Sequence, residues 1–242
     1  MRTDYGQVYR ELYQHHWWWR AREAMILYVL RAQEPPRGWK QILDVGCGNG
    51  LFFDQLSKFG EVQGIEHAKE LVSPSGPHRD RIHIGPFDES FQPREQFSLI
   101  LMLDVLEHLA DPTAALRHAW ALLEPGGTLL VTVPAFMLLW TNHDLLNRHF
   151  TRYTKSSFRH LARAAGIKLD TEKYLFHWLF PVKLAARLLE AVLRLEPAPP
   201  QIPPKWLNNI LFFASHFEYR ALDRAALPFG NSLMVIGRKP AS

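Results

Sequence analysis

The sequence has very little cysteine. Cys47 is the only one among 242 residues, so neither an intramolecular disulfide nor a cluster of thiolate metal ligands can form. The first thirty residues carry Glu11, Glu23 and a run of tryptophans, in place of the basic start and apolar stretch of a signal peptide. We therefore expect a protein of a reducing compartment, the cytoplasm.

Long apolar runs and a strong net charge are also missing. No run of about eighteen apolar residues predicts a membrane span. The net charge of +4 suits an anionic ligand or a membrane surface, but it is too small to indicate nucleic-acid binding, and no basic tract or recognition module supports that function. The 47% of hydrophobic residues can bury one sizeable core, so we expect a single domain with an elaboration.

From Gln41 onward, short apolar runs alternate with helical stretches, a pattern typical of a parallel sheet covered on both faces by helices. Asp111 and Pro112 open a helix that reaches Leu123, and Thr154 caps another that stops at Gly166. The predicted fold is therefore α/β, with a mostly parallel seven-stranded sheet. Its strands are expected at residues 42–45, 62–66, 81–85, 99–103, 128–133, 167–174 and 232–238.

About fifty residues separate the last two predicted strands, far more than an ordinary connection. We interpret this stretch as a helical insertion before the last strand. The single domain, residues 1–242, then has four parts: an N-terminal helical cap at 1–40, a ligand-binding core at 41–175, the insertion at 176–229, and the last strand with a tail at 230–242.

The insertion is expected to form a helical hairpin over residues 181–226, with a proline-rich hinge in its middle. Lys183, Arg187, Glu190 and Arg194 share a narrow polar stripe on its first helix, and the broad apolar side of that helix must be buried. Four surfaces could bury it: the domain itself, a second copy in a homodimer, the inner face of a membrane, or a bound substrate.

A glycine-rich turn follows the first predicted strand in "ILDVGCGNG". Gly46, Gly48 and Gly50 permit a tight turn and let a ligand approach the backbone. Glu66, twenty residues after Gly46, ends the second strand, where a carboxylate can accept both hydroxyls of a ribose. Leu51 replaces the third glycine of the dinucleotide motif, which disfavours a nicotinamide dehydrogenase.

The turn and a second segment, "LILMLDVLEHLADPTAALRHAWALLEPGGTLLVTVPA", together carry a resemblance. Over roughly residues 15–175 the chain resembles the class I S-adenosylmethionine-dependent methyltransferases, and among them the ubiquinone-biosynthesis O-methyltransferase type and related bacterial proteins. The resemblance implies a Rossmann-like fold, S-adenosyl-L-methionine as cofactor and S-adenosyl-L-homocysteine as product.

The resemblance also assigns the cofactor site. It implies that Asp44 organises the glycine turn and that Glu66 holds the ribose. His67 would lie beside the adenine, with Phe87 or Asp88 at its amino group. The turn itself and the end of the fourth strand would contact the methionine part. The implied cofactor residues are Asp44, Gly46, Cys47, Gly48, Gly50, Glu66, His67, Phe87, Asp88, Leu103 and Asp104.

Methyl transfer needs a nucleophile in line with the methyl group, and a hydroxyl nucleophile also benefits from a general base. Glu107 and His108 follow the fourth strand at the carboxyl edge of the sheet, where ligands of such sheets bind. His108 is the leading candidate base because imidazole suits neutral pH. The alternative is that both residues only tie a helix start to neighbouring backbone.

Two other segments are candidates for the acceptor side. In the similar proteins a segment like "HHWWWRAR" covers the cofactor, which makes Trp18 and Arg22 candidates, with packing onto the core as the alternative for the tryptophan. The loop "NHDLLNRHFTRYT" follows the fifth strand. We predict no metal there, because neighbouring His and Asp residues on an irregular loop fix no geometry. Its candidate contacts, two of them also candidate bases, are His143, Asp144, His149, Arg152 and Tyr153. We expect the charged groups among them to be partly paired with each other.

The predicted function is methyl transfer to an oxygen, less favourably to a nitrogen or carbon, of a small-molecule or lipid-linked acceptor. "DVLE" stands where methyltransferases of nucleic-acid amines resemble Asn-Pro-Pro-Tyr, so no nucleic-acid partner is expected. The alternatives are a methyltransferase of RNA or protein and a nonenzymatic module that binds the cofactor. The identity of the acceptor lies beyond the sequence, because acceptor pockets form from the least regular segments of a fold.

Overall fold

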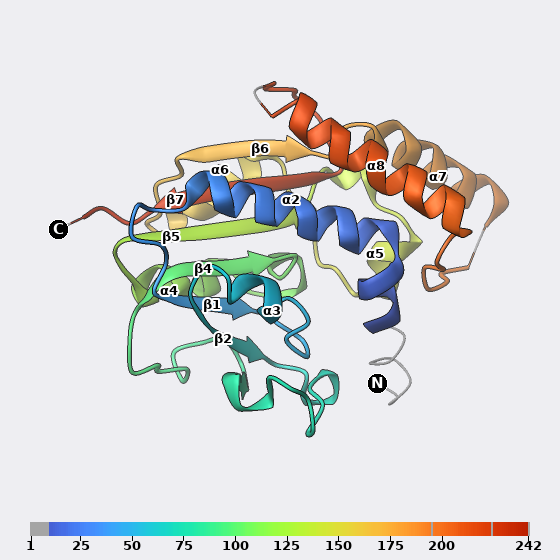
Figure 1. The fold of residues 1–242 in the computed structure, drawn as a ribbon. Helices are drawn as coiled ribbons and strands as arrows, with labels where there is room; N and C mark the ends of the chain where they lie inside the picture. Colours follow the sequence, from blue (N-terminus) through green and yellow to red (C-terminus); the bar gives the residue numbers. More distant parts are fainter. Residues whose placement is uncertain (1–9, 195, 224, 242) are drawn as a thin grey trace.

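The computed structural model describes residues 10–194, 196–223 and 225–241. Its centre is one seven-stranded sheet in the order β3-β2-β1-β4-β5-β7-β6, in which only β7 runs antiparallel to its neighbours (Figure 1). This confirms the predicted mostly parallel α/β sheet. The strands are β1 (Gln41–Val45), β2 (Glu61–Glu66), β3 (Ile82–Ile84), β4 (Phe97–Leu103), β5 (Leu123–Pro134), β6 (Thr171–Leu175) and β7 (Ser232–Arg238).

The sixth strand was predicted to begin too early. Ile167 is buried in the core and Leu169 packs against it, although neither belongs to the sheet. Their apolar alternation therefore reflects packing beneath the sheet and not strand pairing. The expected division of the chain near residues 40, 175 and 229 stays a prediction.

Helices cover both faces of the sheet, and their ends follow the expected capping. The Asp111 side chain accepts from Ala114 N at 3.0 Å, and the Thr154 hydroxyl accepts from Ser157 N at 3.1 Å. The α-helices are α2 (Trp17–Gln33), α3 (Phe53–Leu56), α4 (Pro112–Leu122), α5 (Asn142–Leu146), α6 (Lys155–Ala164), α7 (Leu179–Leu193) and α8 (Lys205–Ala221). Short 3-10 turns are η1 (Lys69–Leu71), η2 (Arg79–Arg81), η3 (Leu106–His108) and η4 (Met137–Leu139).

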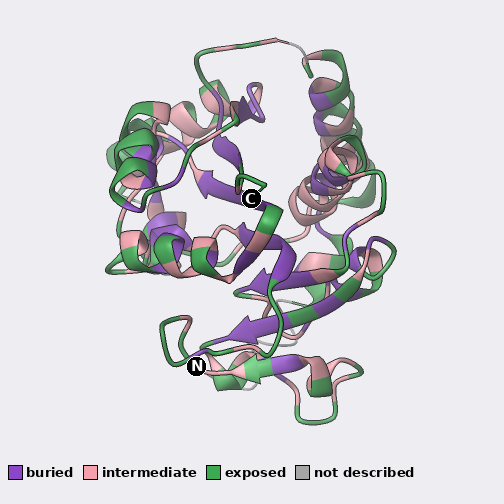
Figure 2. Cartoon of the chain, turned by 90° about the vertical axis from the view of Figure 1, so that its left-hand side faces the viewer, coloured by how far each residue is buried: buried purple, intermediate pink, exposed green. Residues whose placement is uncertain are grey.

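Two apolar layers hold the sheet between these helices. One layer joins the sheet to α4 and α6, and the other joins it to α2, α3 and α8. The strands at the centre are buried, whereas the helices show exposed outer faces (Figure 2). Since β1, β2, β4 and β5 are parallel, their carboxyl ends meet at one edge. Helices α5, α7 and α8 stand at that end of the molecule (Figure 1).

Helix α7 does not bury its apolar side against its own domain, which was one of the four surfaces considered for it. Arg187 Nη1 donates to the carbonyl oxygen of Met137 at 3.0 Å, and Glu190 accepts from Asn142 N at 2.8 Å. Arg187 and Glu190 therefore face the protein, whereas Arg194 at the end of the stripe is exposed. The apolar side faces outward: Leu189 is 57% exposed and Val192 78%. The reason is that the polar stripe satisfies backbone groups of the loop after β5.

The expected hairpin is also not a closely packed pair. Helix α8 packs along α2, whereas α7 lies against η4, and the two share little backbone contact. None of the helices that the structure describes is both long and apolar enough to cross a membrane.

His16 should make the fold sensitive to acid. It is the N-cap of α2, and its Nδ1 accepts from Trp18 N at 3.1 Å. Burial lowers its pKa from 6.5 to about 4. The unfolded chain therefore binds the proton more readily, so the free energy of unfolding should fall as the pH drops from about 6.5 towards 4. His16→Asn keeps a capping acceptor and should show a shallower fall in urea unfolding measured across this range.

The neighbouring exposed His15 provides the control. His15→Asn should keep the pH dependence of the original protein. Equal slopes for all three proteins would remove His16 as a source of the acid sensitivity.

Candidate active site

The glycine turn after β1 has a backbone conformation that lets a ligand come close to it. Gly46, Gly48 and Gly50 all have positive φ, at 73°, 55° and 70°. A Cβ atom on Gly46 would lie 2.8 Å from Val105 Cγ2, so that position tolerates only glycine. Around Gly48 a Cβ atom would meet nothing within 4 Å. The backbone at Gly48 is therefore open to a ligand.

Glu66 lies over this turn. Its side chain is buried, with Oε2 accepting from Gly48 N at 2.9 Å and Oε1 accepting from Ala68 N at 2.8 Å. Each carboxylate oxygen can still accept one more hydrogen bond. The strand end therefore presents a fixed carboxylate of the kind that a ribose diol requires.

The other residues near the turn divide between core and surface. The Cys47 side chain packs into the core, and burial raises its pKa well above the ordinary range, so the thiol is inert. His67 is exposed. Asp44 is buried at the end of β1, and burial raises its pKa to about 7, although Arg22 acts in the opposite direction.

Asp104 has a strained backbone directly after β4. Its φ of 56° is left-handed, which costs free energy for a residue other than glycine. Thr132 Oγ1 donates to Oδ1 at 3.1 Å, and Arg22 Nη2 approaches Oδ2 at 2.9 Å. Helix α2 therefore reaches over this edge. Leu103, just before Asp104, is half-buried against the core.

The two N-terminal candidates therefore have partners within the protein. Arg22 forms an ion pair with Asp104, and its contact with an acceptor group stays a prediction. Trp18 packs on Phe176, with ring centroids 4.6 Å apart, as its alternative interpretation required.

Phe87 and Asp88 follow β3, where the adenine was expected. Phe87 packs edge-on against His118, with ring centroids 5.0 Å apart. Asp88 is exposed and accepts from both the backbone N–H and the hydroxyl of Ser90, which lowers its pKa. Only Asp88 has a carboxylate oxygen to offer an amino group, while Phe87 offers an apolar ring.

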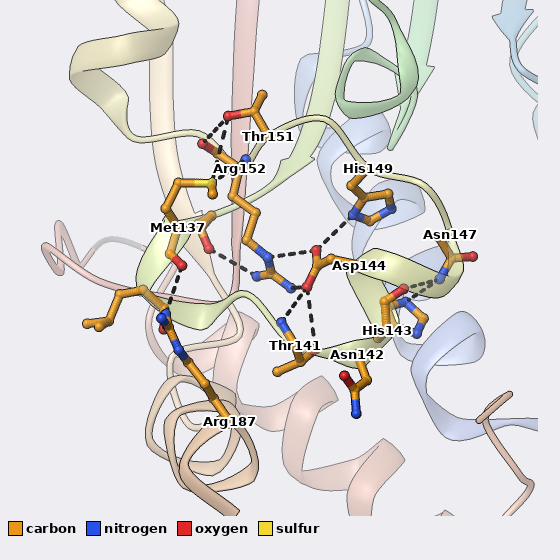
Figure 3. A network of polar contacts seen from close by, with 12 residues as sticks. Met137, Thr141, Asn142, His143, Asp144, Asn147, His149, Thr151, Arg152 and Arg187 are labelled. Carbon is orange, nitrogen blue, oxygen red and sulfur yellow. Dashed lines mark hydrogen bonds and ion pairs between the residues drawn. The ribbon is translucent and has the colours of Figure 1, made fainter. Parts of the chain in front are cut away.

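The loop after β5 is organised by one buried carboxylate, that of Asp144 (Figure 3). Arg152 donates to it twice, from Nε at 2.8 Å and from Nη2 at 2.9 Å. Thr141 N and His149 Nδ1 donate to it at 2.9 and 2.8 Å. Burial alone would raise the pKa of Asp144, but the bonds from His149 and Arg152 outweigh it and hold the pKa far below its usual range.

This loop is joined to η3, so the two motifs singled out in the sequence meet. Phe150 N donates to the carbonyl oxygen of Glu107 at 2.7 Å, and the Tyr153 hydroxyl donates to that of Leu106 at 3.2 Å. The rings of His108 and His149 meet edge to face, 4.7 Å apart. One ligand atom from each of Glu107, His108 and His149 lies within 4.8 Å of the others.

Glu107 is the unusual member of this cluster. Its side chain is fully buried, and neither carboxylate oxygen has a hydrogen-bond partner among the residues that the structure describes. Burial, followed by the nearby charge of Asp104, raises its pKa well above the ordinary value. Such a group needs either a proton or a cation beside it.

Three of the expected acceptor contacts need correction. Asp144, Arg152 and Tyr153 are buried and bonded within the protein, so they support the loop and cannot present polar groups on its surface. His143 is half-buried beside Asn147, and burial, with the charge of Lys183, lowers its pKa to about 4.

Two supporting residues were missed in the sequence. Thr141 belongs to a capping box with Asp144, which the spacing of "TNHD" before two leucines could have revealed. Thr132, which fixes Asp104, is a polar residue inside an apolar strand. Its position in the strand carries no comparable signal.

The open sheet, the glycine turn and the carboxylate that ends β2 define a class of protein that binds nucleosides at the carboxyl edge of its strands. Comparisons with known proteins narrow this class. Residues 16–172 match the family described as methyltransferase domain. The chain belongs to this family, and its sheet is that of the class I S-adenosylmethionine-dependent methyltransferases.

Individual relatives agree with the family. A ubiquinone biosynthesis O-methyltransferase of Xanthomonas axonopodis pv. citri is 29% identical over 209 residues, 83% of this chain and 81% of that protein. One of Bradyrhizobium diazoefficiens is 32% identical over 101 residues, which span 39% of this chain and only 40% of the relative's length. The methyltransferase solved in complex with the Haloferax volcanii Trm112 activator has a TM-score of 0.59 at 18% identity, covering 99% of this chain and 96% of its own.

Breaking the buried ion pair should strongly destabilise the protein. Asp144→Asn leaves the Arg152 guanidinium buried without its counter-ion, a change that typically costs about 3–5 kcal/mol. We expect a large fall in Tm by calorimetry. The matched control is Glu172→Gln, which removes the partner of the exposed Arg159 and should leave the Tm nearly unchanged. Equal Tm values for the two variants would contradict the structural role of Asp144.

Proposed function

We propose that the protein uses S-adenosyl-L-methionine to methylate an oxygen of a small-molecule or lipid-linked acceptor. The observation that carries the proposal is the meeting of a nucleoside site with a histidine cluster at one sheet edge. Gly48 and Glu66 form the former, and His108 and His149 the latter. The O-methyltransferase names of the relatives support oxygen as the acceptor atom.

The cofactor fits the residues present. The open backbone at Gly48 and the free acceptor capacity of Glu66 suit a ribose. Asp104 and Leu103, which end β4, would lie along its methionine part, and Asp88 would reach the adenine amino group. When bound, the cofactor supplies a methyl group on a cationic sulfonium. The protein's own task is then to hold the acceptor in line and to take up its proton.

His149 replaces His108 as the leading base. The Asp144 carboxylate accepts from its Nδ1 at 2.8 Å, so a neutral ring carries its proton on Nδ1 and has a lone pair on Nε2. Arg152 and Thr141 hold that carboxylate in place. The arrangement fixes both the tautomer and the direction of the imidazole.

A divalent cation is the second candidate use of this cluster. The specific observation is that Glu107, His108 and His149 offer three ligand atoms within 4.8 Å of one another, while the Glu107 carboxylate has no partner among the described residues. Imidazole and carboxylate are ordinary ligands of such ions. The two uses exclude each other at His149 Nε2.

Two other functions remain as alternatives. A macromolecular acceptor would show itself as a strongly salt-dependent affinity for RNA, or as methylation of a protein. A nonenzymatic module would bind the cofactor without turning over any acceptor in a broad panel.

The ribose assignment is tested at Glu66. Glu66→Ala removes a charged acceptor of two hydroxyl groups, so S-adenosyl-L-homocysteine should bind at least about tenfold more weakly in calorimetry. Glu61→Ala, at the exposed start of the same strand, is the matched control and should bind as the original protein does. Unchanged affinity in a folded Glu66 variant would refute the assignment.

The base assignment is tested at His149. With a hydroxylated acceptor that the original protein methylates, His149→Ala should lower kcat about a hundredfold or more and leave cofactor affinity nearly unchanged. His108→Ala should lower kcat less. Chelation of the original protein distinguishes the cation: loss of turnover that added Mg²⁺ restores would favour the second candidate, while equal kcat values for both variants and the original protein would exclude both uses.

A further inference from the structure

The described helices of the insertion, α7 and α8, expose their apolar faces and turn polar side chains towards the protein. Apart from Phe229, every large hydrophobic side chain that the structure describes as exposed belongs to α7, α8 or the loop after β5. We call these residues the apolar rim: Met137, Leu138, Leu145, Leu146, Phe150, Val182, Leu188, Leu189, Val192, Leu193, Trp206, Ile210, Phe213 and Phe217. Their elements gather at the carboxyl edge of the sheet (Figure 1).

The spacing shows that these are complete helix faces and not scattered residues. Along α8, Trp206, Ile210, Phe213 and Phe217 recur at intervals of three and four and are 57–74% exposed. Along α7, Val182, Leu189 and Leu193 follow a similar stripe, at intervals of seven and four residues. A monomer in water seldom exposes apolar surface on this scale.

The opposite faces of both helices carry polar side chains that form hydrogen bonds within the protein, and these bonds fix the orientation. In α8, Asn208 Oδ1 accepts from Trp17 N at 2.8 Å, and Glu218 accepts from the backbone N–H groups of His177 and Trp178 at 2.9 and 2.7 Å. Ser215 accepts from the indole N–H of Trp178 at 3.2 Å. Rotating the helix to bury its apolar face would leave these groups without partners, at a cost for each.

Charge decides between the possible occupants of the rim. Among the described residues of 137–150 and 179–221, the exposed side chains that carry charge are four cations and one acid, Glu196. The cations are Arg148, Arg194, Lys205 and Arg220. A twofold interface between identical copies would bring these cations together. Anionic lipid headgroups would neutralise them, and a tryptophan such as Trp206 suits the interface of a bilayer.

We propose that the apolar rim docks the protein onto an anionic lipid bilayer, with α7 and α8 lying in the interfacial plane. The apolar side chains enter the acyl boundary while the cations meet the headgroups. Since the rim lies at the carboxyl edge of the sheet, docking places the candidate active site close to the membrane. The proposal concerns binding alone and does not depend on the methyl-transfer reaction.

The test is flotation of the whole protein with phosphatidylcholine vesicles made with and without phosphatidylglycerol. We expect binding to the anionic vesicles that weakens with salt. Leu189→Glu combined with Phe217→Glu should reduce that binding by at least about tenfold. The matched control, Ala121→Glu with Ala164→Glu, adds the same charge at the C-terminal ends of α4 and α6, away from the rim, and should retain most of the binding.

Three outcomes would overturn the proposal. They are absence of flotation, equal loss of binding in both double variants, and a stable dimer of the original protein that only the rim variant dissolves, measured by light scattering. Circular dichroism checks that each variant is folded. Affinity for S-adenosyl-L-homocysteine, measured in parallel, should be the same in all of them, so a failure of cofactor binding is seen separately.

Discussion

The buried carboxylate of Asp144 is the group on which the rest of the candidate site depends. It accepts five hydrogen bonds, from Arg152 twice, from His149, and from both the backbone N–H and the hydroxyl of Thr141. A carboxylate without such donors could not stay ionised in the protein interior. By satisfying it completely, the loop after β5 gains a rigid centre, and the imidazole of His149 gains a fixed direction.

The loop after β5 lies beside a strained segment that follows β4, since Phe150 N donates to the carbonyl oxygen of Glu107. Asp104 has a left-handed backbone and is held by Thr132 and Arg22, which belong to β5 and α2. Two residues on from Val105, Glu107 is buried without a hydrogen-bond partner in the described part of the chain. Strain and an unsatisfied carboxyl both cost stability, and such costs concentrate at functional sites. Burial of the apolar residues of β4 offsets this loss of stability.

Local signals in the sequence predicted the parts of this site that depend on one segment. The glycine turn needs only its own backbone, so Gly46 and Gly48 were found where the structure has them. Pairing among the charged groups of the loop after β5 was expected, but the particular partner of Arg152 was not, because the Asp144 carboxylate reaches it only once α5 has folded back through its capping box. Likewise, the contact of His149 with His108 joins two loops of the sheet and leaves no trace in spacing.

The orientation of α7 and α8 shows a different limit of periodicity. Spacing identifies an amphipathic helix, but it does not say which face meets the protein. Here the orientation is set by backbone N–H groups at helix starts. Asn208 accepts from Trp17 N at the start of α2, and Glu218 accepts from Trp178 N at the start of α7. Helix starts always leave such donors, and here polar side chains of a later helix satisfy them. Because the polar face of α8 forms these hydrogen bonds, its apolar face points outward, and exposing that face to water is unfavourable.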